Sequence, residues 1–270
     1  MSDTRELEVL VPTCDRPAEL AVTLSGLAAQ AVPGFAVILS DQSEGEPAYE
    51  APAARAMIRV LARAGHPVRV SRNLPRRGLA QQRAHLLELS SARYVLYLDD
   101  DVWLEPGTLA RLHSAIVELG CGFVGNAVQG LSYLDDYRPD ELARFEEWRG
   151  RPEPEQVLPG TAQWQRWTLH NAANPTHLSD AVARRPKWTA YKVAWIGGCV
   201  LFDREMLAST GGFGFWRELP ETHCGEDVLA QLRVMAKYGG AGILPTGAVH
   251  LESPTTVPDR SVEAYDAVSP

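Results

Sequence analysis

Strand-like and helix-like segments alternate through the first half of the chain, and this alternation restricts the fold more than any other feature. The strand-like segments are residues 7–11, 35–39, 67–70, 94–98 and 122–128. The helix-like segments between and after them are residues 17–28, 51–64, 78–89 and 104–119. Repeated strand–helix units predict an α/β fold with a mixed, mostly parallel sheet flanked by helices.

The regular alternation stops at about residue 129. Residues 129–190 are rich in proline, tryptophan and charged residues, and we expect an irregular insertion with one short helix near residues 141–148. Regular structure is expected to return at residues 195–202, followed by a helix at residues 226–238 and a short strand at residues 241–244. The tail at 251–270 is expected to be extended over the surface or partly disordered. We therefore predict one domain with halves at 1–128 and 129–250, followed by this tail.

Composition narrows the classes of partner and the compartment. The 270 residues carry a formal net charge of -8, and an acidic balance argues against nucleic acid, because binding a phosphate backbone usually needs a basic surface. The N-terminal residues show no apolar signal core, and no stretch approaches the roughly 20 apolar residues of a transmembrane segment. Four scattered cysteines without a CxxC pair fit a reducing compartment. We expect a soluble, cytoplasmic protein.

Three adjacent carboxylates, Asp99, Asp100 and Asp101, follow the apolar segment at 94–98. Ligands of such sheets bind beyond the carboxyl ends of the strands, where this run and Asp41 both fall. Residues i and i+2 of an extended segment point the same way, so Asp99 and Asp101 can face one ligand together. Hard oxygen donors suit Mg²⁺ or Mn²⁺, which bridge one or two carboxylates to phosphate oxygens. The alternative is a solvated acidic turn.

Several motifs, taken in their order along the chain, resemble those of family 2 glycosyltransferases. The matching segments are residues 9–17 for the opening motif, Ser40-Asp41 for the second-strand carboxylate, Asn73 with residues 78–83 for the segment before the DxD motif, residues 98–102 for the DxD motif, residues 195–199 for a glycine-rich acceptor-side segment and residues 225–229 for the ED motif. Cys14, Asp15 and Ala84 depart from the commoner tyrosine, asparagine and asparagine.

The resemblance covers about residues 7–250 and implies a GT-A (Rossmann-like) fold. It makes residues 1–128 the nucleotide-sugar-binding half and residues 129–250 the acceptor-side half. It also implies a divalent metal, Mn²⁺ or Mg²⁺, and transfer of a sugar from a nucleoside-diphosphate donor to a hydroxyl acceptor, which would be a glycan, a glycolipid or a small molecule. We expect inversion at the anomeric carbon.

On the donor side, the resemblance places Pro12, Thr13 and Asp15 in the nucleoside pocket and Arg16 near the phosphates. Asp41 would accept a hydrogen bond from an N–H of the base, such as that of uracil, which favours a UDP-linked sugar. The alternative for Asp41 is a helix or turn cap.

The same resemblance assigns further donor and metal contacts. Gly78 would allow close backbone approach, Arg83 would face the donor, and Asp100 would contact the ribose, with Asp99 beside it. The alternative for Arg83 is an ordinary residue on a helix surface. The implied metal ligands are Asp99, Asp101 and His250. A neutral imidazole can bind Mn²⁺, although a lone histidine is more often structural.

On the acceptor side, the residues singled out are Trp195, Gly197, Gly198 and Trp216. Indole rings suit stacking on sugar faces, and the alternative is packing within the insertion. The adjacent carboxylates Glu226 and Asp227 lie at a predicted helix N-terminus, where the helix dipole keeps a carboxylate ionised. By resemblance to the ED motif, Asp227 is the general base and Glu226 binds the acceptor or supports the loop. The alternative is that both are helix caps.

Two other functions remain open from the sequence. A nucleotidyltransferase that makes the activated sugar would have a glycine-rich, basic loop after the first strand, whereas residues 12–17 contain neither glycine nor lysine. A non-catalytic sugar- or nucleotide-binding protein on the same fold would not need Asp99, Asp101 and Asp227, which are all present.

Overall fold

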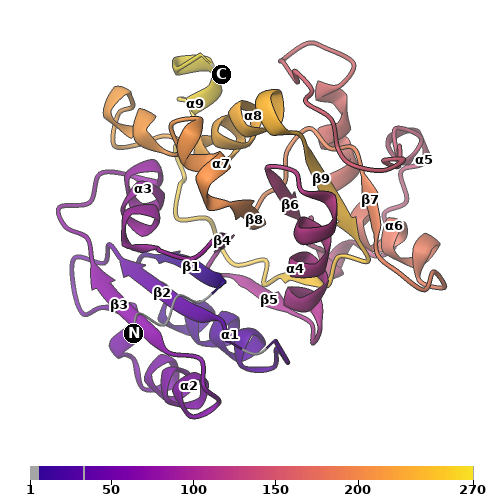
Figure 1. The fold of residues 1–270 in the computed structure, drawn as a ribbon. Coiled ribbons are helices and arrows are strands. Elements are labelled where there is room, and N and C mark those ends of the chain that lie inside the picture. The colour runs from indigo at the N-terminus through magenta and orange to yellow at the C-terminus, as the bar shows by residue number, and fades with distance from the viewer. Residues whose placement is uncertain (1–5, 33, 270) are drawn as a thin grey trace.

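Eight strands form one mixed sheet within residues 6–32 and 34–269, the part of the chain that this computed structural model describes (Figure 1). In their order across the sheet they are β3 (Val68–Arg72), β2 (Ala36–Asp41), β1 (Leu7–Thr13), β4 (Tyr94–Leu98), β8 (Cys199–Asp203), β6 (Phe123–Gly125), β9 (Gly240–Leu244) and β7 (Thr189–Tyr191). The pairs β1–β2, β1–β4, β2–β3 and β6–β9 are parallel. β8 runs antiparallel to β4 and β6, and β7 runs antiparallel to β9. The predicted mixed, mostly parallel sheet is confirmed.

Helices cover both faces of this sheet. The α-helices are α1 (Pro17–Ala28), α2 (Pro52–Arg63), α3 (Leu79–Leu89), α4 (Thr108–Leu119), α5 (Pro139–Leu142), α6 (Asn174–Val182), α7 (Arg204–Ser209), α8 (Glu226–Tyr238) and α9 (Ala264–Ala267). The short 3₁₀ helices are η1 (Ala48–Glu50), η2 (Leu131–Tyr133), η3 (Trp164–His170) and η4 (Gly214–Glu218). A separate antiparallel ribbon pairs β5 (Val102–Leu104) with β10 (Ala248–His250). No helix within the described ranges is both long enough and apolar enough to cross a membrane.

The alternation of side chains along the strands creates two cores. On β1, Val9 and Val11 pack in one core with residues of α1, α2 and α4, whereas Leu10 packs in the other with residues of α3, α7 and α8. Successive strand residues point to opposite faces, so these strands must be apolar at nearly every position. β1, β2 and β4 are accordingly buried along their whole length.

The parallel register brings several strand ends to one edge of the sheet. Thr13 at the end of β1 pairs with Asp41 at the end of β2, and β4 ends at Leu98, immediately before the three aspartates. The segments that follow these strands therefore meet at one edge, as the sequence predicts.

The insertion contains more regular structure than the sequence predicts. Its short helix spans Pro139–Leu142 rather than residues near 141–148, and η3, α6 and β7 were not predicted. Leu169, Leu178 and Val182 of these elements are buried in the α8-side core. Helices this short contain too few turns to show a clear apolar period, and their stability comes from tertiary packing.

The tail differs from the prediction in a similar way. It is extended from His250 to about residue 262, but it then forms α9, whose Ala264 is buried. An isolated bridge between Cys224 and Glu263, with the Ala264 N–H donating to the Cys224 carbonyl at 2.8 Å, attaches it to the start of α8.

Candidate functional site

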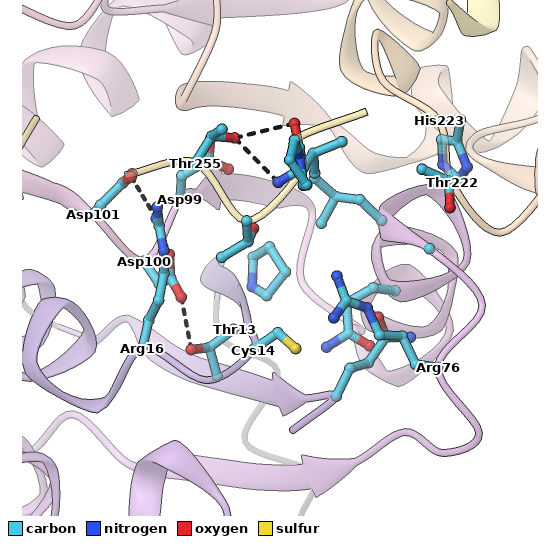
Figure 2. A pocket seen from close by; sticks show the side chains of 18 of the residues that line it. Thr13, Cys14, Arg16, Arg76, Asp99, Asp100, Asp101, Thr222, His223 and Thr255 are labelled. Carbon is cyan, nitrogen blue, oxygen red and sulfur yellow. Dashed lines mark hydrogen bonds and ion pairs between the residues drawn. The ribbon is translucent and has the colours of Figure 1, made fainter. Parts of the chain in front are cut away.

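A cavity of about 910 Å³ opens at the edge of the sheet where the first strands end (Figure 2). The aspartates after β4, the segment after β1, the N-terminus of α3 and the tail all contribute to it. The predicted residues that line it are Pro12, Thr13, Arg16, Gly78, Asp99, Asp100, Asp101 and His250. Other lining residues include Cys14, Gln42, Glu44, Arg76, Gln82, Thr222, His223, Ser253, Thr255, Thr256, Asp259 and Arg260. The cavity is thus lined by both acidic and basic groups.

Arg16 connects two of the three aspartates, as the dashed lines of Figure 2 show in part. Its Nη1 lies 2.5 Å from Asp101 Oδ2 and 3.2 Å from Asp100 Oδ1. Asp100 is buried and accepts a hydrogen bond from Thr13 Oγ1 at 2.7 Å. Burial raises the pKa of Asp100 to about 7, although the Thr13 bond and Arg16 act in the opposite direction. Arg16 therefore neutralises a carboxylate pair that would otherwise repel.

Asp101 and His250 are brought together by the β5–β10 ribbon. His250 Nε2 lies 3.5 Å from Asp101 Oδ2, and the Leu251 N–H donates to the Asp101 carbonyl at 2.9 Å. His250 Nδ1 accepts the Glu252 N–H at 2.9 Å, so a neutral ring carries its proton on Nε2, toward Asp101. With its proton on Nε2, this nitrogen has no free lone pair with which to coordinate a metal. Coordination by His250 therefore stays a prediction and requires loss of the Glu252 hydrogen bond.

The residues at the cavity fit a divalent cation that also binds phosphate. Within residues 6–32 and 34–269, no group of three or more His, Cys, Asp or Glu side chains could hold a metal ion by itself. Asp99 and Asp101 nevertheless both line the cavity, and Mg²⁺ typically takes only one or two carboxylates, with phosphates and water completing its shell. Asp101 and Asp99 would hold such an ion jointly with the ligand.

Asp99 and Glu226 are joined by a buried arginine. Arg83 Nη2 lies 2.8 Å from Asp99 Oδ1, and Arg83 Nε donates to Glu226 Oε1 at 2.9 Å. Arg83 is 3% exposed and is absent from the lining of the cavity, so its contact with a donor stays a prediction. Its charge is paired with the carboxylates of Asp99 and Glu226.

Asp227 follows Glu226 in the first turn of α8 and is partly exposed. Burial, reinforced by the charge of Glu226, raises the pKa of Asp227 to about 7, and Arg83 opposes this shift. The helix begins after Gly225, which has a left-handed φ of 72° and whose Cβ, if present, would lie 2.5 Å from Glu263 Oε2. The backbone at this position therefore favours glycine and places the carboxylate pair beside Arg83.

Asp41 is held by the loop that follows it. Its side chain is fully buried; Oδ1 accepts the Ser43 N–H at 2.6 Å and Oδ2 accepts the Ala48 N–H at 2.6 Å. This geometry corresponds to the turn-cap alternative, and Asp41 is not among the residues that line the cavity. Asp15 has a φ of 57°, and its N–H donates to Ser43 Oγ at 2.8 Å, so both residues order the loop after β2. Contact with a base stays a prediction for both.

The predicted acceptor-side residues fall into two groups. Gly198 lies beside Asp99, because the Asp99 N–H donates to the Gly198 carbonyl at 2.9 Å, and Gly197 precedes it. Trp195 packs against Trp164, with ring centroids 4.6 Å apart, and Trp216 packs against the α8-side core. Both indoles are therefore packed against other side chains, and acceptor binding by all four residues stays a prediction.

Two parts of the cavity were not predicted from the sequence. Residues 253 and 255–260 of the tail line it, and an Arg16 Nη2–Pro254 carbonyl hydrogen bond holds the tail over the aspartates. His223 lines it as well, and its Nε2 accepts the Ala80 N–H at the start of α3. The tail has no periodicity that would signal a contact, and a single histidine in a loop gives no positional signal.

The sequence profile described as glycosyl transferase family 2 matches residues 8–173, more than half of the chain. The chain belongs to this family. The expected GT-A fold is also confirmed by solved structures of similar architecture. No sequence among the curated proteins matches that of this chain.

Two solved structures show the extent of the similarity. S. aureus TarS residues 1–349, solved in complex with UDP-GlcNAc, is 16% identical with a TM-score of 0.58, over 93% of this chain and 60% of that one. The mannosyltransferase PcManGT from Pyrobaculum calidifontis, solved with GDP-Man and Mn²⁺, is 16% identical with a TM-score of 0.58, over 94% of this chain and 59% of that one. The chain thus spans about six-tenths of the length of these proteins, and at this identity the likeness shows the fold alone.

Proposed function

We propose that this family member is an inverting glycosyltransferase that moves a sugar from a nucleoside-diphosphate donor, UDP-linked in our proposal, to a hydroxyl acceptor. One observation carries the proposal. Arg83 joins Asp99, which lines the cavity, to Glu226, so the carboxylate Asp227 lies next to the place where a donor would bind. Transfer to a hydroxyl needs a base beside the bound donor, and an ionised Asp227 carboxylate would supply it.

In this proposal, the donor's diphosphate lies over the aspartates that follow β4. Asp101 and Asp99 would hold Mn²⁺ or Mg²⁺, which stabilises the charge that develops on the leaving diphosphate. Arg16 lies between Asp100 and Asp101 and is the lining cation nearest to both, so it is placed to bind a phosphate oxygen when the metal takes over Asp101. The two neighbours solved with UDP-GlcNAc and with GDP-Man and Mn²⁺ support a ligand of this chemical class.

Asp227 would remove the proton from the acceptor hydroxyl as that oxygen attacks the anomeric carbon. A general base works best when its pKa is close to the working pH, and the pKa of Asp227 is raised to about 7. Glu226 is less suitable, because its carboxylate is buried and engaged by Arg83. The hydroxyl oxygen forms the new glycosidic bond, the bond to the diphosphate breaks, and the proton goes to Asp227.

The test is a screen of nucleotide sugars for metal-dependent release of nucleoside diphosphate, with and without added hydroxyl acceptors. We expect release with a UDP-sugar in Mn²⁺ or Mg²⁺, none in EDTA, and a product of inverted anomeric configuration by NMR. Release of pyrophosphate from a sugar phosphate and a nucleoside triphosphate would instead indicate a nucleotidyltransferase. Thermal stabilisation by UDP with Mn²⁺, but no turnover of any donor, would indicate a binding protein.

A further inference from the structure

The buried guanidinium of Arg83 interacts electrostatically with three carboxylates in this site. Arg83 comes from α3, Asp99 from the end of β4, and Glu226 and Asp227 from the first turn of α8. The side chains of Arg83 and Glu226 are each 4% exposed, so water screens their contact very little. The side chain of Asp99 is 34% exposed and lines the cavity. Arg83 therefore links a carboxylate that lines the cavity to a carboxylate in the interior.

The position of Arg83 is fixed by its surroundings as well as by its two ion pairs. Tyr97 donates its hydroxyl to the Arg83 carbonyl at 2.8 Å, and the guanidinium lies 5.7 Å from the centre of the Tyr97 ring. Tyr97 in turn contacts Phe202 and Phe213 edge-to-face in the core. A planar guanidinium in a fixed location can point one N–H at each of two carboxylates, which an ammonium group cannot do with the same geometry.

The two carboxylates of the α8 turn are treated differently by this arrangement. Glu226 receives the Nε–H of Arg83, whereas Asp227 takes no side-chain hydrogen bond from it and is the more exposed of the two. Asp227 still feels the positive charge, which favours its ionised form. Arg83 thus donates hydrogen bonds to Asp99 and Glu226. It donates none to Asp227, whose carboxylate can therefore accept a proton from another group.

We propose that Arg83 is a positioning residue for sugar transfer: its two-pronged contact locks Asp99 of the donor side to Glu226 of the acceptor side and leaves Asp227 as the carboxylate free to act. This inference rests on the proposed function. It assigns to Arg83 a direct side-chain link between the bound donor and the base, in addition to the hydrogen bonds of Gln231 in α8 to the Ile196 backbone. A misplacement of about 1 Å in such an arrangement costs about 10²-fold in rate.

Two substitutions separate the geometry of Arg83 from its charge. Arg83→Lys keeps the positive charge but loses the fork, so we expect kcat to fall about 10- to 100-fold while the KM for the donor changes less than about threefold. Arg83→Met removes the charge, so we expect the pKa of Asp227 to rise by about 1 pH unit or more, because an opposite charge nearby normally holds a carboxyl pKa down. Arg69→Met is the matched control: Arg69 pairs with the buried Glu8 at 2.9 Å, away from the cavity.

The experiment measures kcat, KM and melting temperature for the three variants and follows the Asp227 carboxyl by ¹³C NMR from pH 5 to 9. Because the NMR titration does not need turnover, it also reports on Arg83→Met if that variant is inactive. Arg83→Met/Glu226→Gln removes the orphaned buried carboxylate and supplies a folded sample if the single variant unfolds. The same rise in the Asp227 pKa on comparing Glu226→Gln with the double variant would support the inference.

The inference is overturned if Arg83→Lys retains the kcat of the wild type, or if its loss of rate only follows its loss of folded protein. It is also overturned if removal of the charge leaves the Asp227 pKa unchanged in a folded variant. Wild-type protein that releases no nucleotide from any donor would instead contradict the proposed function. In that case a raised Asp227 pKa in Arg83→Met would still show the electrostatic link, so the two failures are distinguishable.

Discussion

Replacing Asp227 with asparagine tests the base directly, because it keeps the shape of the side chain and removes the group that accepts the proton. Loss of a general base typically lowers the rate by about 10²–10⁴-fold. Donor binding should change little, since Asp227 is absent from the lining of the cavity where the aspartates after β4 lie. The measurement is kcat with saturating donor, alongside the donor Kd from calorimetry. Glu226→Gln, in the same turn, tests whether the neighbouring carboxylate is the base instead, and Arg69→Met, away from the cavity, is the control.

The pH dependence of kcat gives this prediction a magnitude. The pKa of Asp227 is raised to about 7, and only the ionised form can take a proton. With that pKa, the ionised fraction grows from about 0.09 at pH 6 to about 0.91 at pH 8, so the wild-type kcat should rise about tenfold between those values. Below pH 6 the rate should fall by about tenfold per pH unit, because the base is then mostly protonated.

A second group titrates in the same range and must be separated from the first. Burial also raises the pKa of Asp100 to about 7. Asp227→Asn distinguishes the two groups: its residual rate should be flat from pH 6 to 8 if the wild-type slope belongs to Asp227. A tenfold slope that persists in Asp227→Asn would assign the titration to Asp100 and refute the reasoning. So would a wild-type rate for Asp227→Asn at any pH in this range.

As the pH rises, the contribution of Asp227 to folding stability should fall, whereas the catalytic rate should increase. The folded-state pKa of Asp227 lies above the usual carboxyl value of 3.8, so the folded protein binds more protons than the unfolded chain between about pH 4 and pH 7. The contribution of Asp227 to stability is therefore largest below pH 4 and is lost as the pH rises through 7. The melting temperature of Asp227→Asn, relative to the wild type, should accordingly increase from pH 5 to pH 8.

Two further predictions follow from the cavity and the α3 turn. Asp101→Ala should abolish metal-dependent thermal stabilisation by UDP, because Asp101 lines the cavity. The variant should still fold, since the pairing of Asp101 with Arg16 is only one of several contacts there. Stabilisation by UDP with Mn²⁺ equal to that of the wild type would contradict the metal assignment. Gly78→Ala should lower the melting temperature by several degrees, because a Cβ at φ 86° would lie 2.4 Å from His223 Cε1 and 2.5 Å from the Glu221 carbonyl oxygen. Gly34→Ala is the control, because Gly34 has a similar φ of 84° with nothing within 4 Å of an added Cβ. An equal loss in both variants would show that the clash is unimportant.

The parts of this protein that could be predicted from sequence are those governed by short-range patterns. The apolar strands at 94–98 and 7–11 and the helix at 226–238 match β4, the first part of β1 and α8 closely, because each pattern fits one regular element. The parallel-sheet rule also placed the three aspartates beyond the carboxyl ends of the strands, where the cavity lies. The helix expected from residue 104 begins at Thr108 instead, because residues 102–104 pair with β10.

The side-chain roles that could not be predicted depend on partners far away in the sequence. Asp41 lies at the expected strand end, yet the N–H groups of Ser43 and Ala48 turn its carboxylate inward. Arg83 belongs to a helix whose pattern does not distinguish a surface arginine from a buried one, and its partner Glu226 is 143 residues away. A helical period specifies which residues share a face, but not which distant carboxylate meets that face.

The tail makes one long-range contact with a residue that the sequence predicts to lie near the donor's phosphates. Arg16 follows β1 in the motif that implies phosphate binding, and in the structure it contacts Asp100, Asp101 and the Pro254 carbonyl together. A metal bound at Asp101 would compete with Arg16 for that carboxylate, and a diphosphate beside it would offer the guanidinium another acceptor. Because the Pro254 contact lies on a segment that lines the cavity, the proposed donor binding would be linked to the position of the tail through Arg16. The strength of that coupling depends on how completely the cation replaces Arg16 at Asp101.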